Sequence, residues 1–314
     1  MEYLFVINPV AGKISRREEL EEKIRSLGTE CKVTVKVTTK PGEATEIVRR
    51  HLENTSEFTR VFACGGDGTA NEVLTGMVGF ENAAMGVIPT GSGNDFVRSL
   101  KGFKREDFMD ISRMIDGEEI AVDVMECQGR YSMNVLSVGY DCAVAKNVDK
   151  FKKIPFVSGS LAYKMSIIYC LFTKREHHFR ILVDGKRYAD EKICTLLTVA
   201  GKGSYYGGGI KAAPKARLND GKIEFMHITT IPALKFIFLL GQYIKGNHVD
   251  NPRFPFVKSM KCQSITFESD KEIDVNFEGE IIPMKNPTIR IIPNAVKVII
   301  PKAPAKVLAG SVAE

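Results

Sequence analysis

The chain has 314 residues, of which 44% are hydrophobic and 26% are charged, and its formal net charge is +6. This length is sufficient for two cores, and the composition is that of a soluble globular protein. The positive charge favours anionic partners, but no run of lysine and arginine is dense enough to predict a nucleic-acid interface. Seven cysteines without a C-x-x-C pair indicate reduced thiols and a cytoplasmic protein.

The first 120 residues alternate between apolar runs and amphipathic stretches. The runs 3–7, 33–37, 60–63 and 84–88 predict strands, and the stretches 16–27, 41–52 and 71–77 predict helices. A further helix is expected after the loop 89–96. This order predicts an open parallel sheet with helices on both faces. In such sheets ligands bind at the carboxyl ends of the strands, so we expect one site at the loops of Asn8, Thr38, Gly65 and Gly91.

The loop Cys64-Gly65-Gly66-Asp67-Gly68-Thr69 joins a predicted strand to a predicted helix. Glycines let backbone N–H groups approach a polyphosphate, and the helix N-terminus adds partial positive charge. The carboxylate of Asp67 would repel a bare phosphate, which points to a Mg²⁺-nucleotide. The alternative is a plain glycine turn. The dinucleotide fingerprint is excluded because Asn71 stands at its third glycine, and the P-loop is excluded because Ile14 follows Lys13.

From about residue 120 the pattern is mainly strand-like and predicts an antiparallel domain of the β-sandwich type. Two helices are expected, at 158–173 and 233–245. The first domain is predicted to span residues 1–125, the second 126–293, and the tail 303–314 is expected to be disordered. The longest apolar stretch, 231–243, is too short to span a bilayer. Strands are expected at 120–126, 179–183, 193–200, 222–228, 264–269, 273–277, 288–292 and 297–300.

Four stretches together resemble the diacylglycerol-kinase catalytic family. They are Gly65–Thr69 with Asn71-Glu72, Pro89-Thr90-Gly91-Ser92-Gly93-Asn94-Asp95-Phe96, Asn8–Gly12, and Leu218-Asn219-Asp220-Gly221. The resemblance covers residues 1–300 and is closest to the soluble bacterial lipid kinases. It implies a nucleotide domain related to those of NAD kinase and phosphofructokinase, a β-sandwich lipid-substrate domain, and an active site in the cleft between them. It also implies that residues 294–302 return to the first domain.

The activity implied by the resemblance is transfer of a phosphoryl group from ATP, with Mg²⁺, to a lipid hydroxyl. Diacylglycerol is the preferred acceptor, and the product would be phosphatidic acid. A sphingosine-like lipid, a polyisoprenoid or glycolipid, or NAD stay open as acceptors, as does an inactive nucleotide-binding regulator. A lipid at the inner membrane surface and a homodimer are the expected partners. The helix containing Leu234, Phe238 and Leu239 is expected either to attach to the membrane or to lie in the core.

The resemblance assigns residues position by position. Asp67, Asp95 and Asp123 match three carboxylates that form a network with water and Mg²⁺. The alternatives are a helix cap for Asp95 and an exposed strand end for Asp123. Nucleotide contacts are implied for Asn8, Pro9, Gly12, Thr38, Gly65, Gly66, Asp67, Gly68, Thr69, Asn71 and Ser92. A separate structural Mg²⁺ is implied at the side chain of Asp220 and the carbonyls of Arg217 and Lys222, where the residues alone predict a hairpin turn.

The catalytic base is expected in Phe277-Glu278-Gly279-Glu280. The family has Asp-Gly-Glu there, so Glu280 matches the proton acceptor and Glu278 replaces the usual Asp. This change leaves open how Glu280 is oriented, or whether both acids share the task. The residues alone favour a surface hairpin with two solvated acids. The glycine-rich loop 201–209 is expected to be mobile and close to the cleft, with contact to a lipid headgroup as the alternative.

Overall fold

The computed structural model describes residues 1–12, 14–26, 32–154, 159–173, 176–190 and 193–303, and it divides the chain into two compact units. The first unit contains Met1–Val122 and the chain from Asn294 onward, and the second contains Asp123–Pro293. The division therefore falls three residues before the expected end of the first domain. The predicted tail lies outside the described residues, except for its first residue.

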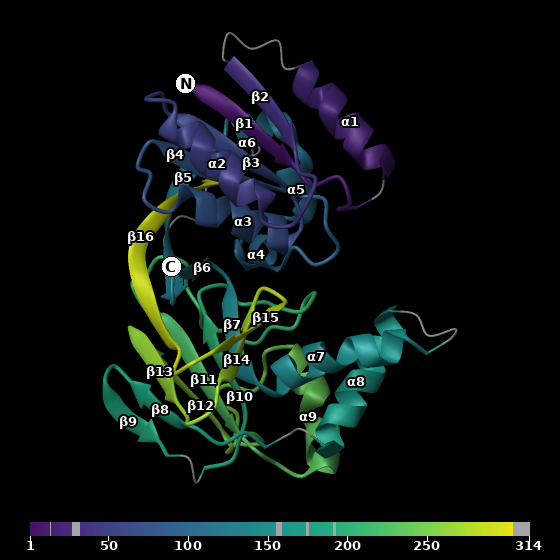
Figure 1. The fold of residues 1–314 in the computed structure, drawn as a ribbon, viewed down its shortest axis with the longest axis vertical. Helices are drawn as coiled ribbons and strands as arrows, with labels where there is room; N and C mark the ends of the chain where they lie inside the picture. Colours follow the sequence, from purple (N-terminus) through teal and green to yellow (C-terminus); the bar gives the residue numbers. More distant parts are fainter. Residues whose placement is uncertain (13, 27–31, 155–158, 174–175, 191–192, 304–314) are drawn as a thin grey trace. The chain divides into compact units, whose positions relative to one another are not determined.

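The first unit contains a parallel sheet in the order β2-β1-β3-β4, to which the last part of β16 is added (Figure 1). Every residue of β1 and β4 is buried, as expected for strands covered on both faces. Lys297 and Val298 of β16 pair in parallel with Ala84 and Met85 of β4. The strands are β1 (Glu2–Ile7), β2 (Lys32–Val37), β3 (Thr59–Gly65), β4 (Ala83–Pro89) and β16 (Thr288–Ile300).

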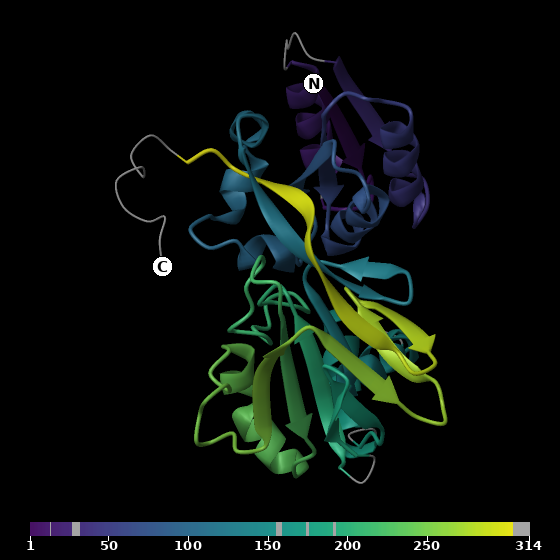
Figure 2. The ribbon, with the colours of Figure 1, turned by 90° about the vertical axis from the view of Figure 1, so that its left-hand side faces the viewer.

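Helices lie on both faces of this sheet. Buried Ala44, Val48 and Leu52 form the inner face of α2, and α2 packs against α3. The chain moves one way across the sheet from β1 to β2, and the opposite way from β2 to β3 and from β3 to β4. Because such crossovers are right-handed, α1 lies on the face opposite to α2 and α3. Figure 2 shows α1 and α2 on opposite sides of the strands. The helices are α1 (Ile14–Arg25), α2 (Glu43–Glu53), α3 (Asp67–Met77), α4 (Asp95–Ser99), α5 (Arg105–Met109) and α6 (Ile111–Ile115).

The second unit is a β-sandwich, so the predicted fold class is confirmed. One layer is an antiparallel sheet in the order β12-β11-β10-β7-β14-β15. Its strands are β7 (Val135–Gly139), β10 (Thr195–Gly201), β11 (Ile223–Thr229), β12 (Val257–Cys262), β14 (Ile273–Phe277) and β15 (Glu280–Met284). The second layer contains β5 (Glu118–Cys127), β6 (Arg130–Ser132), β8 (Arg180–Val183), β9 (Lys186–Ala189), β13 (Ser264–Glu268) and the beginning of β16. Phe225 and Leu136 of the first layer share one core with Phe267 and Ile181 of the second.

Three helices cover the other face of the antiparallel sheet: α7 (Tyr140–Lys152), α8 (Gly159–Thr173) and α9 (Ala233–Ile244). Tyr140 and Val144 of α7 form a second core with Leu197 and Met226 of the sheet. The expected strand-like pattern is therefore wrong for residues 140–152. The two strands expected at 288–292 and 297–300 form one strand, β16. Within the described ranges, no helix is both long enough and apolar enough to cross a bilayer.

Candidate functional site

The four predicted loops of the first unit meet at the carboxyl edge of its sheet. The backbone N–H of Thr38 donates to the carbonyl of Ile7 at 2.9 Å, and that of Asn8 donates to the carbonyl of Cys64 at 3.0 Å. The side-chain amide of Asn8 donates to the hydroxyl of Thr69 at 2.9 Å. These bonds join the ends of β2, β1 and β3 to the start of α3, so the loops form one connected surface.

Glycine is required where these loops touch one another. The backbone N–H of Gly91 donates to the carbonyl of Gly65 at 3.1 Å. A Cβ added to Gly91 would lie 2.4 Å from the Cα of Gly66, and one added to Gly12 would lie 2.6 Å from the oxygen of Thr90. Around Gly68, by contrast, a Cβ would meet no atom within 4 Å. The loops are therefore packed tightly against each other and leave open space at the beginning of α3.

Asp67 and Asp95 are brought together in the first unit. Asp67 is the first residue of α3 and is half-buried, and its Oδ1 accepts the backbone N–H groups of Asp95 at 2.7 Å and Phe96 at 3.3 Å. Asp67 therefore caps the N-terminus of α4. Helix capping is the alternative role given above for Asp95, and in the structure the carboxylate of Asp67 performs it. The side chain of Asp95 is buried, with Arg98 Nε 3.6 Å from its Oδ1. Asp123 belongs to the second unit, and the three-carboxylate network stays a prediction.

Two asparagines next to these acids hold buried acceptor oxygens. Oδ1 of Asn71 and Oδ1 of Asn94 accept no hydrogen bond in the described part of the chain. Buried acceptors are normally satisfied, so each of these two oxygens is a candidate acceptor for a water or a ligand donor. Arg105, which the sequence reasoning missed, holds the second loop by donating to the carbonyls of Pro89 at 2.7 Å and Gly91 at 3.2 Å.

The other residues predicted to contact the nucleotide differ in accessibility. Ser92 and Gly12 are exposed, and Pro9 is half-buried. Thr38 is buried, and its hydroxyl lies 3.4 Å from the carbonyl oxygen of Ile7. The hydroxyl of Ser92 is therefore better placed to meet a ligand than that of Thr38.

The expected hairpin at residues 277–280 is the turn between β14 and β15. Glu278 and Gly279 form its two central residues, with φ of 51° and 100°. Positive φ at both central positions matches the twist of a two-residue hairpin, and it is unfavourable for a glutamate. The carboxylate of Glu278 accepts the hydroxyl of Ser132 at 2.6 Å, the backbone N–H of Val135 at 3.3 Å and the side-chain amide of Asn134 at 3.3 Å. The alternative of a solvated acid is therefore wrong for Glu278.

Glu280 has a different environment. Its side chain is 67% exposed, and its Oε2 lies 3.4 Å from Nη1 of Arg130, which is itself 48% exposed. An exposed ion pair of this kind contributes little to stability. The turn thus carries one anchored carboxylate, at Glu278, and one accessible carboxylate, at Glu280.

The predicted structural Mg²⁺ site is organised around a lysine. Nζ of Lys202 lies 2.8 Å from Asp123 Oδ2, 2.8 Å from Asp220 Oδ1 and 2.8 Å from the carbonyl of Lys222. Asp220 and Lys222 supply two of the three oxygens that the resemblance assigns to the metal, while Arg217 is exposed. These two oxygens therefore do not fit a Mg²⁺ ion, because both already accept hydrogen bonds from the ammonium group of Lys202.

The beginning of the loop 201–209 is fixed by this contact. Lys202 is fully buried, and the backbone N–H groups of Lys202 and Gly203 donate to the carbonyl of Asn134 at 2.8 and 2.9 Å. The expectation of a mobile loop is therefore wrong for its first residues. The partners of Lys202 lie 79 and 18 residues away in the sequence, so no local pattern could have indicated them.

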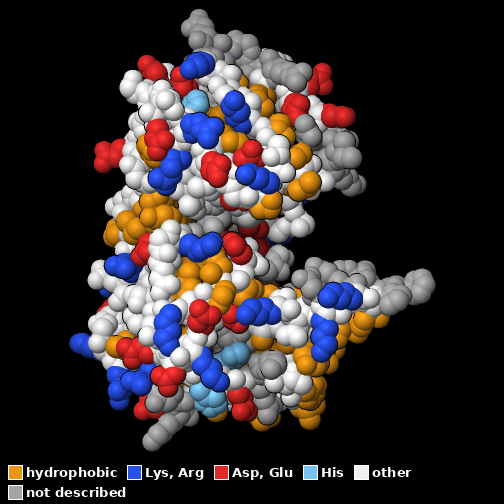
Figure 3. All heavy atoms as spheres, in the orientation of Figure 1, with side chains coloured by type: hydrophobic (Ala, Val, Ile, Leu, Met, Phe, Trp, Pro, Cys, Tyr) orange, Lys and Arg blue, Asp and Glu red, His pale blue; other side chains and the backbone are white. Residues whose placement is uncertain are grey.

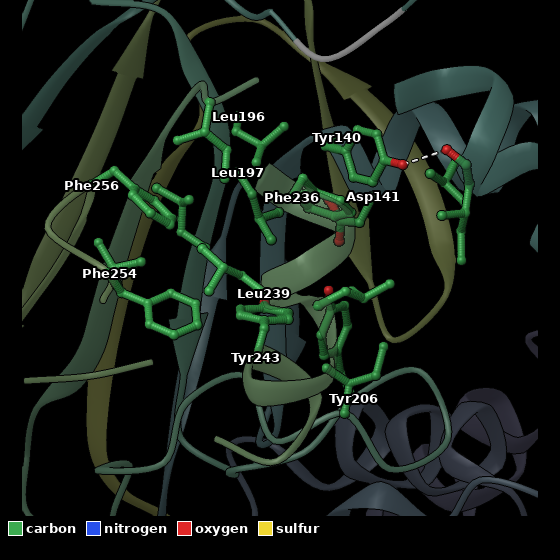
Figure 4. Close-up of a pocket in the computed structure, with 17 residues that line it drawn as sticks. Tyr140, Asp141, Leu196, Leu197, Tyr206, Phe236, Leu239, Tyr243, Phe254 and Phe256 are labelled. Atoms are coloured by element: carbon green, nitrogen blue, oxygen red, sulfur yellow. Dashed lines mark hydrogen bonds between the residues drawn. The ribbon is translucent and has the colours of Figure 1, made fainter. Parts of the chain in front are cut away.

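A cavity lies in the second unit (Figure 4). Leu196 and Leu197 of β10 face Phe236 and Tyr243 of α9 across it, and Asp141 lies at the beginning of α7. Among the described residues that line it there is no lysine, arginine or histidine, and Asp141 is the one carboxylate. The lining is typical of a site for an apolar molecule with few polar groups.

Asp141 is the polar feature of this cavity. Its carboxylate accepts the hydroxyl of Ser137, the side-chain amide of Asn276 at 3.2 Å and the backbone N–H of Cys142 at 2.9 Å. Burial raises the pKa of Asp141, although these hydrogen bonds oppose the shift. The sequence reasoning missed this residue, whose signal is a single acid in the mainly apolar stretch 135–144.

The helices beside the cavity carry a second apolar surface that faces solvent. On α9, Leu234 is 70% exposed and Phe238 is 84% exposed, and on α8 Ile168 and Phe172 are also exposed. Figure 3 shows hydrophobic side chains gathered over these helices with lysine and arginine side chains beside them. For Leu234 and Phe238 the alternative of a core position is therefore wrong, and we call these four residues the apolar helix surface.

Comparison with known proteins agrees with this architecture. The family model for the diacylglycerol kinase catalytic domain matches residues 2–127, and the model for the YegS C-terminal NAD kinase beta sandwich-like domain matches residues 134–300. The chain is 28% identical over 308 residues to the diacylglycerol kinase of Bacillus subtilis, covering 96% of this chain and 97% of that one. It is 29% identical over 280 residues to a Staphylococcus epidermidis diacylglycerol kinase, covering 88% and 84%. A crystal structure of a diacylglycerol kinase from Bacillus anthracis shares the fold, with a TM-score of 0.69 at 21% identity over 95% of this chain and 96% of that one. The chain therefore belongs to the diacylglycerol-kinase catalytic family, with a second domain of the YegS type, and is a lipid kinase.

Proposed function

We propose that this lipid kinase transfers the γ-phosphoryl group of ATP to the hydroxyl of diacylglycerol and so produces phosphatidic acid. The observation that carries the choice of acceptor is the cavity of the second unit. The long hydrocarbon chains of diacylglycerol suit a lining that is apolar apart from one carboxylate, Asp141, and the hydroxyls of three tyrosines. NAD or a glycolipid would place many polar groups against this lining, and each buried group without a partner costs about 1–3 kcal/mol.

A sphingosine-like lipid is the second candidate acceptor, because its ammonium group could pair with Asp141. Two features of Asp141 favour diacylglycerol over it. The carboxylate already accepts hydrogen bonds from Ser137, Asn276 and Cys142, and burial, which raises its pKa, disfavours a charged group at this place. Both features reduce its capacity to bind an added ammonium group.

The nucleotide is proposed to bind at the connected loops of the first unit. The open space at Gly68 and the first N–H groups of α3 suit phosphate oxygens. Asp67 and Asp95, with the buried oxygens of Asn71 and Asn94, suit a hydrated Mg²⁺, which prefers oxygen ligands. When bound, Mg²⁺ would neutralise charge on the phosphates.

Glu280 is proposed to accept the proton of the lipid hydroxyl, and Glu278 is proposed to position the turn. A base must have a lone pair that the substrate can reach. Glu280 is exposed and has one weak partner, whereas three protein donors occupy the carboxylate of Glu278. The longer side chain of Glu278, in place of the usual Asp, is compatible with this anchoring role.

The apolar helix surface is proposed to contact the membrane that supplies the lipid. The side of α9 that bears Phe236 and Tyr243 lines the cavity, and the side that bears Leu234 and Phe238 faces solvent. Exposed aromatic and aliphatic side chains beside lysines are the features of helices that lie in the interfacial region of anionic membranes. Such contact would place the enzyme as a peripheral protein at the inner membrane face.

The acceptor proposal is tested with labelled ATP and separate mixed micelles of diacylglycerol, a sphingosine-like lipid and a glycolipid, together with NAD in solution. Leu240→Trp fills the cavity, and Ile193→Trp is its control at an exposed apolar position outside both the cavity lining and the apolar helix surface. We expect phosphorylation of diacylglycerol, a raised KM for it in Leu240→Trp, and unchanged KM for ATP in both variants. Preferred phosphorylation of another acceptor, or an unchanged lipid KM in Leu240→Trp, would contradict the proposal.

A further inference from the structure

The ion cluster around Lys202 joins three separate segments of the second unit. Lys202 directly follows the last residue of β10, Asp123 lies on β5, and Asp220 and Lys222 belong to the turn before β11. The side chains of Lys202 and Asp123 are 0% and 1% exposed. We propose that the ammonium group of Lys202 is the resident cation of this cluster and replaces the structural Mg²⁺ that the resemblance implies.

The hydrogen bonds of Lys202 are complete. An ammonium group has three N–H donors, and three oxygens accept from Nζ, each at 2.8 Å. The backbone N–H of Gly221 adds a bond to Asp123 Oδ2 at 2.7 Å. A fully buried lysine is stable in its charged form only with such partners, so the site is built around the positive charge.

A second lysine, Lys261, binds the other carboxylate oxygen of Asp220. Nζ of Lys261 lies 2.9 Å from Asp220 Oδ2 and 3.5 Å from Glu224 Oε2. Both oxygens of Asp220 are therefore occupied by ammonium groups. A Mg²⁺ ion bound to the same carboxylate would be repelled by two positive charges and would find its ligands taken.

The stability of the second unit should for this reason be independent of divalent cations. Thermal unfolding is measured without nucleotide, in EDTA and in millimolar MgCl₂ or CaCl₂, and metal content is measured after gel filtration. For the natural chain we expect equal Tm values in all three buffers and no stoichiometric metal. The Asp67→Ala variant is measured in the same buffers as a control, because it should lose any Tm response to cations that originates at the nucleotide loops.

Lys202→Ala should convert the cluster into a cation site, because it leaves Asp123, Asp220 and a carbonyl around a vacated space. Breaking a buried ion pair should lower Tm in EDTA by roughly 10 °C. Mg²⁺ or Ca²⁺ should restore part of this loss. Lys261→Ala is the matched control: it removes a lysine from the same carboxylate, but Lys261 is partly exposed, so a smaller loss without rescue is expected.

Three results would overturn the proposal. The first is a cation response of the natural chain that persists in Asp67→Ala and disappears in Asp220→Ala, since a metal would then occupy the cluster. The second is a Tm of Lys202→Ala in EDTA equal to that of the natural chain. The third is a loss in Lys202→Ala that no cation restores. If Lys202→Ala does not fold, the Tm and metal content of the natural chain still decide the question.

Discussion

Glutamine substitution at each glutamate of the β14–β15 turn separates the proton acceptor from the positioning residue. Glu280→Gln replaces an accessible carboxylate by an amide of equal size that cannot take up a proton. The saturated rate of phosphorylation should fall by about a hundredfold to ten-thousandfold, the range for loss of a positioned general base. Stability should change little, because the Glu280 side chain is 67% exposed and its ion pair with Arg130 is weak.

Glu278→Gln should lower the stability more, and the catalytic rate less, than Glu280→Gln does. The Glu278 carboxylate accepts three hydrogen bonds, and the amide of Asn134 approaches one of its oxygens while Ser132 and Val135 approach the other. A glutamine has a single acceptor oxygen, so at least one of these donors must face an NH₂ group. The expected loss is about 1–3 kcal/mol of unfolding free energy, with a smaller fall in rate than for Glu280→Gln.

Both variants are compared under saturating ATP and diacylglycerol, and their stabilities are measured by urea unfolding. Glu278→Asp is the control: it restores the family's usual acid and should retain activity. If Glu278→Gln is inactive but as stable as the unsubstituted chain, while Glu280→Gln is active, the two roles are exchanged. If both are fully active, neither glutamate is the base.

Three further predictions concern other parts of the enzyme. Asp67→Ala should lower the rate roughly a thousandfold or more through lost charge neutralisation, while the thermal unfolding profile shows a folded protein; natural turnover of the purified variant would refute this. Ser92→Val should raise the apparent KM for ATP with a nearly unchanged saturated rate, and Thr38→Val should do so less because its hydroxyl already donates to Ile7; unchanged KM in both would remove them from the nucleotide site. Burial lowers the pKa of His227 to about 4, so only the unfolded chain gains its proton between pH 7 and 5, and stability should fall by about 2 kcal/mol over that interval. Urea unfolding at both pH values should show a smaller fall in His227→Gln, and an equal fall would contradict the assignment.

The sheet of the first unit was predictable because its strands are encoded locally. Continuous apolar runs at 3–7 and 84–88 correspond to β1 and β4, which are buried at every residue. Each run ends in a loop rich in glycine or polar residues, and parallel order places those ends on one edge. The contacts between Asn8 and Thr69 and between Gly65 and Gly91 follow from that order. Pattern and topology together were therefore sufficient to bring the predicted nucleotide residues together.

Helix α7 was missed although its sequence carries a helical signal. Tyr140, Val144 and Val148 are buried at a spacing of four residues, as expected for one face of a helix. The preceding strand β7 is buried throughout and leads directly into Tyr140, so the periodicity changes without a loop. Gly139, with φ of 117°, is the one turn-type residue at this boundary, and a single glycine inside a buried run is a weak mark of the change from strand to helix.

The roles of the carboxylates were the least predictable feature, because their partners are distant in sequence. Three aspartates were expected to share one metal network, yet the protein itself already compensates two of them. The Asp67 carboxylate caps α4 through the N–H groups of Asp95 and Phe96, and Asp123 is paired with buried Lys202. A residue type and its position relative to a strand can indicate where a carboxylate lies. Whether a metal, a backbone dipole or a lysine balances its charge depends on side chains brought together by folding, and a single lysine is enough to change the answer.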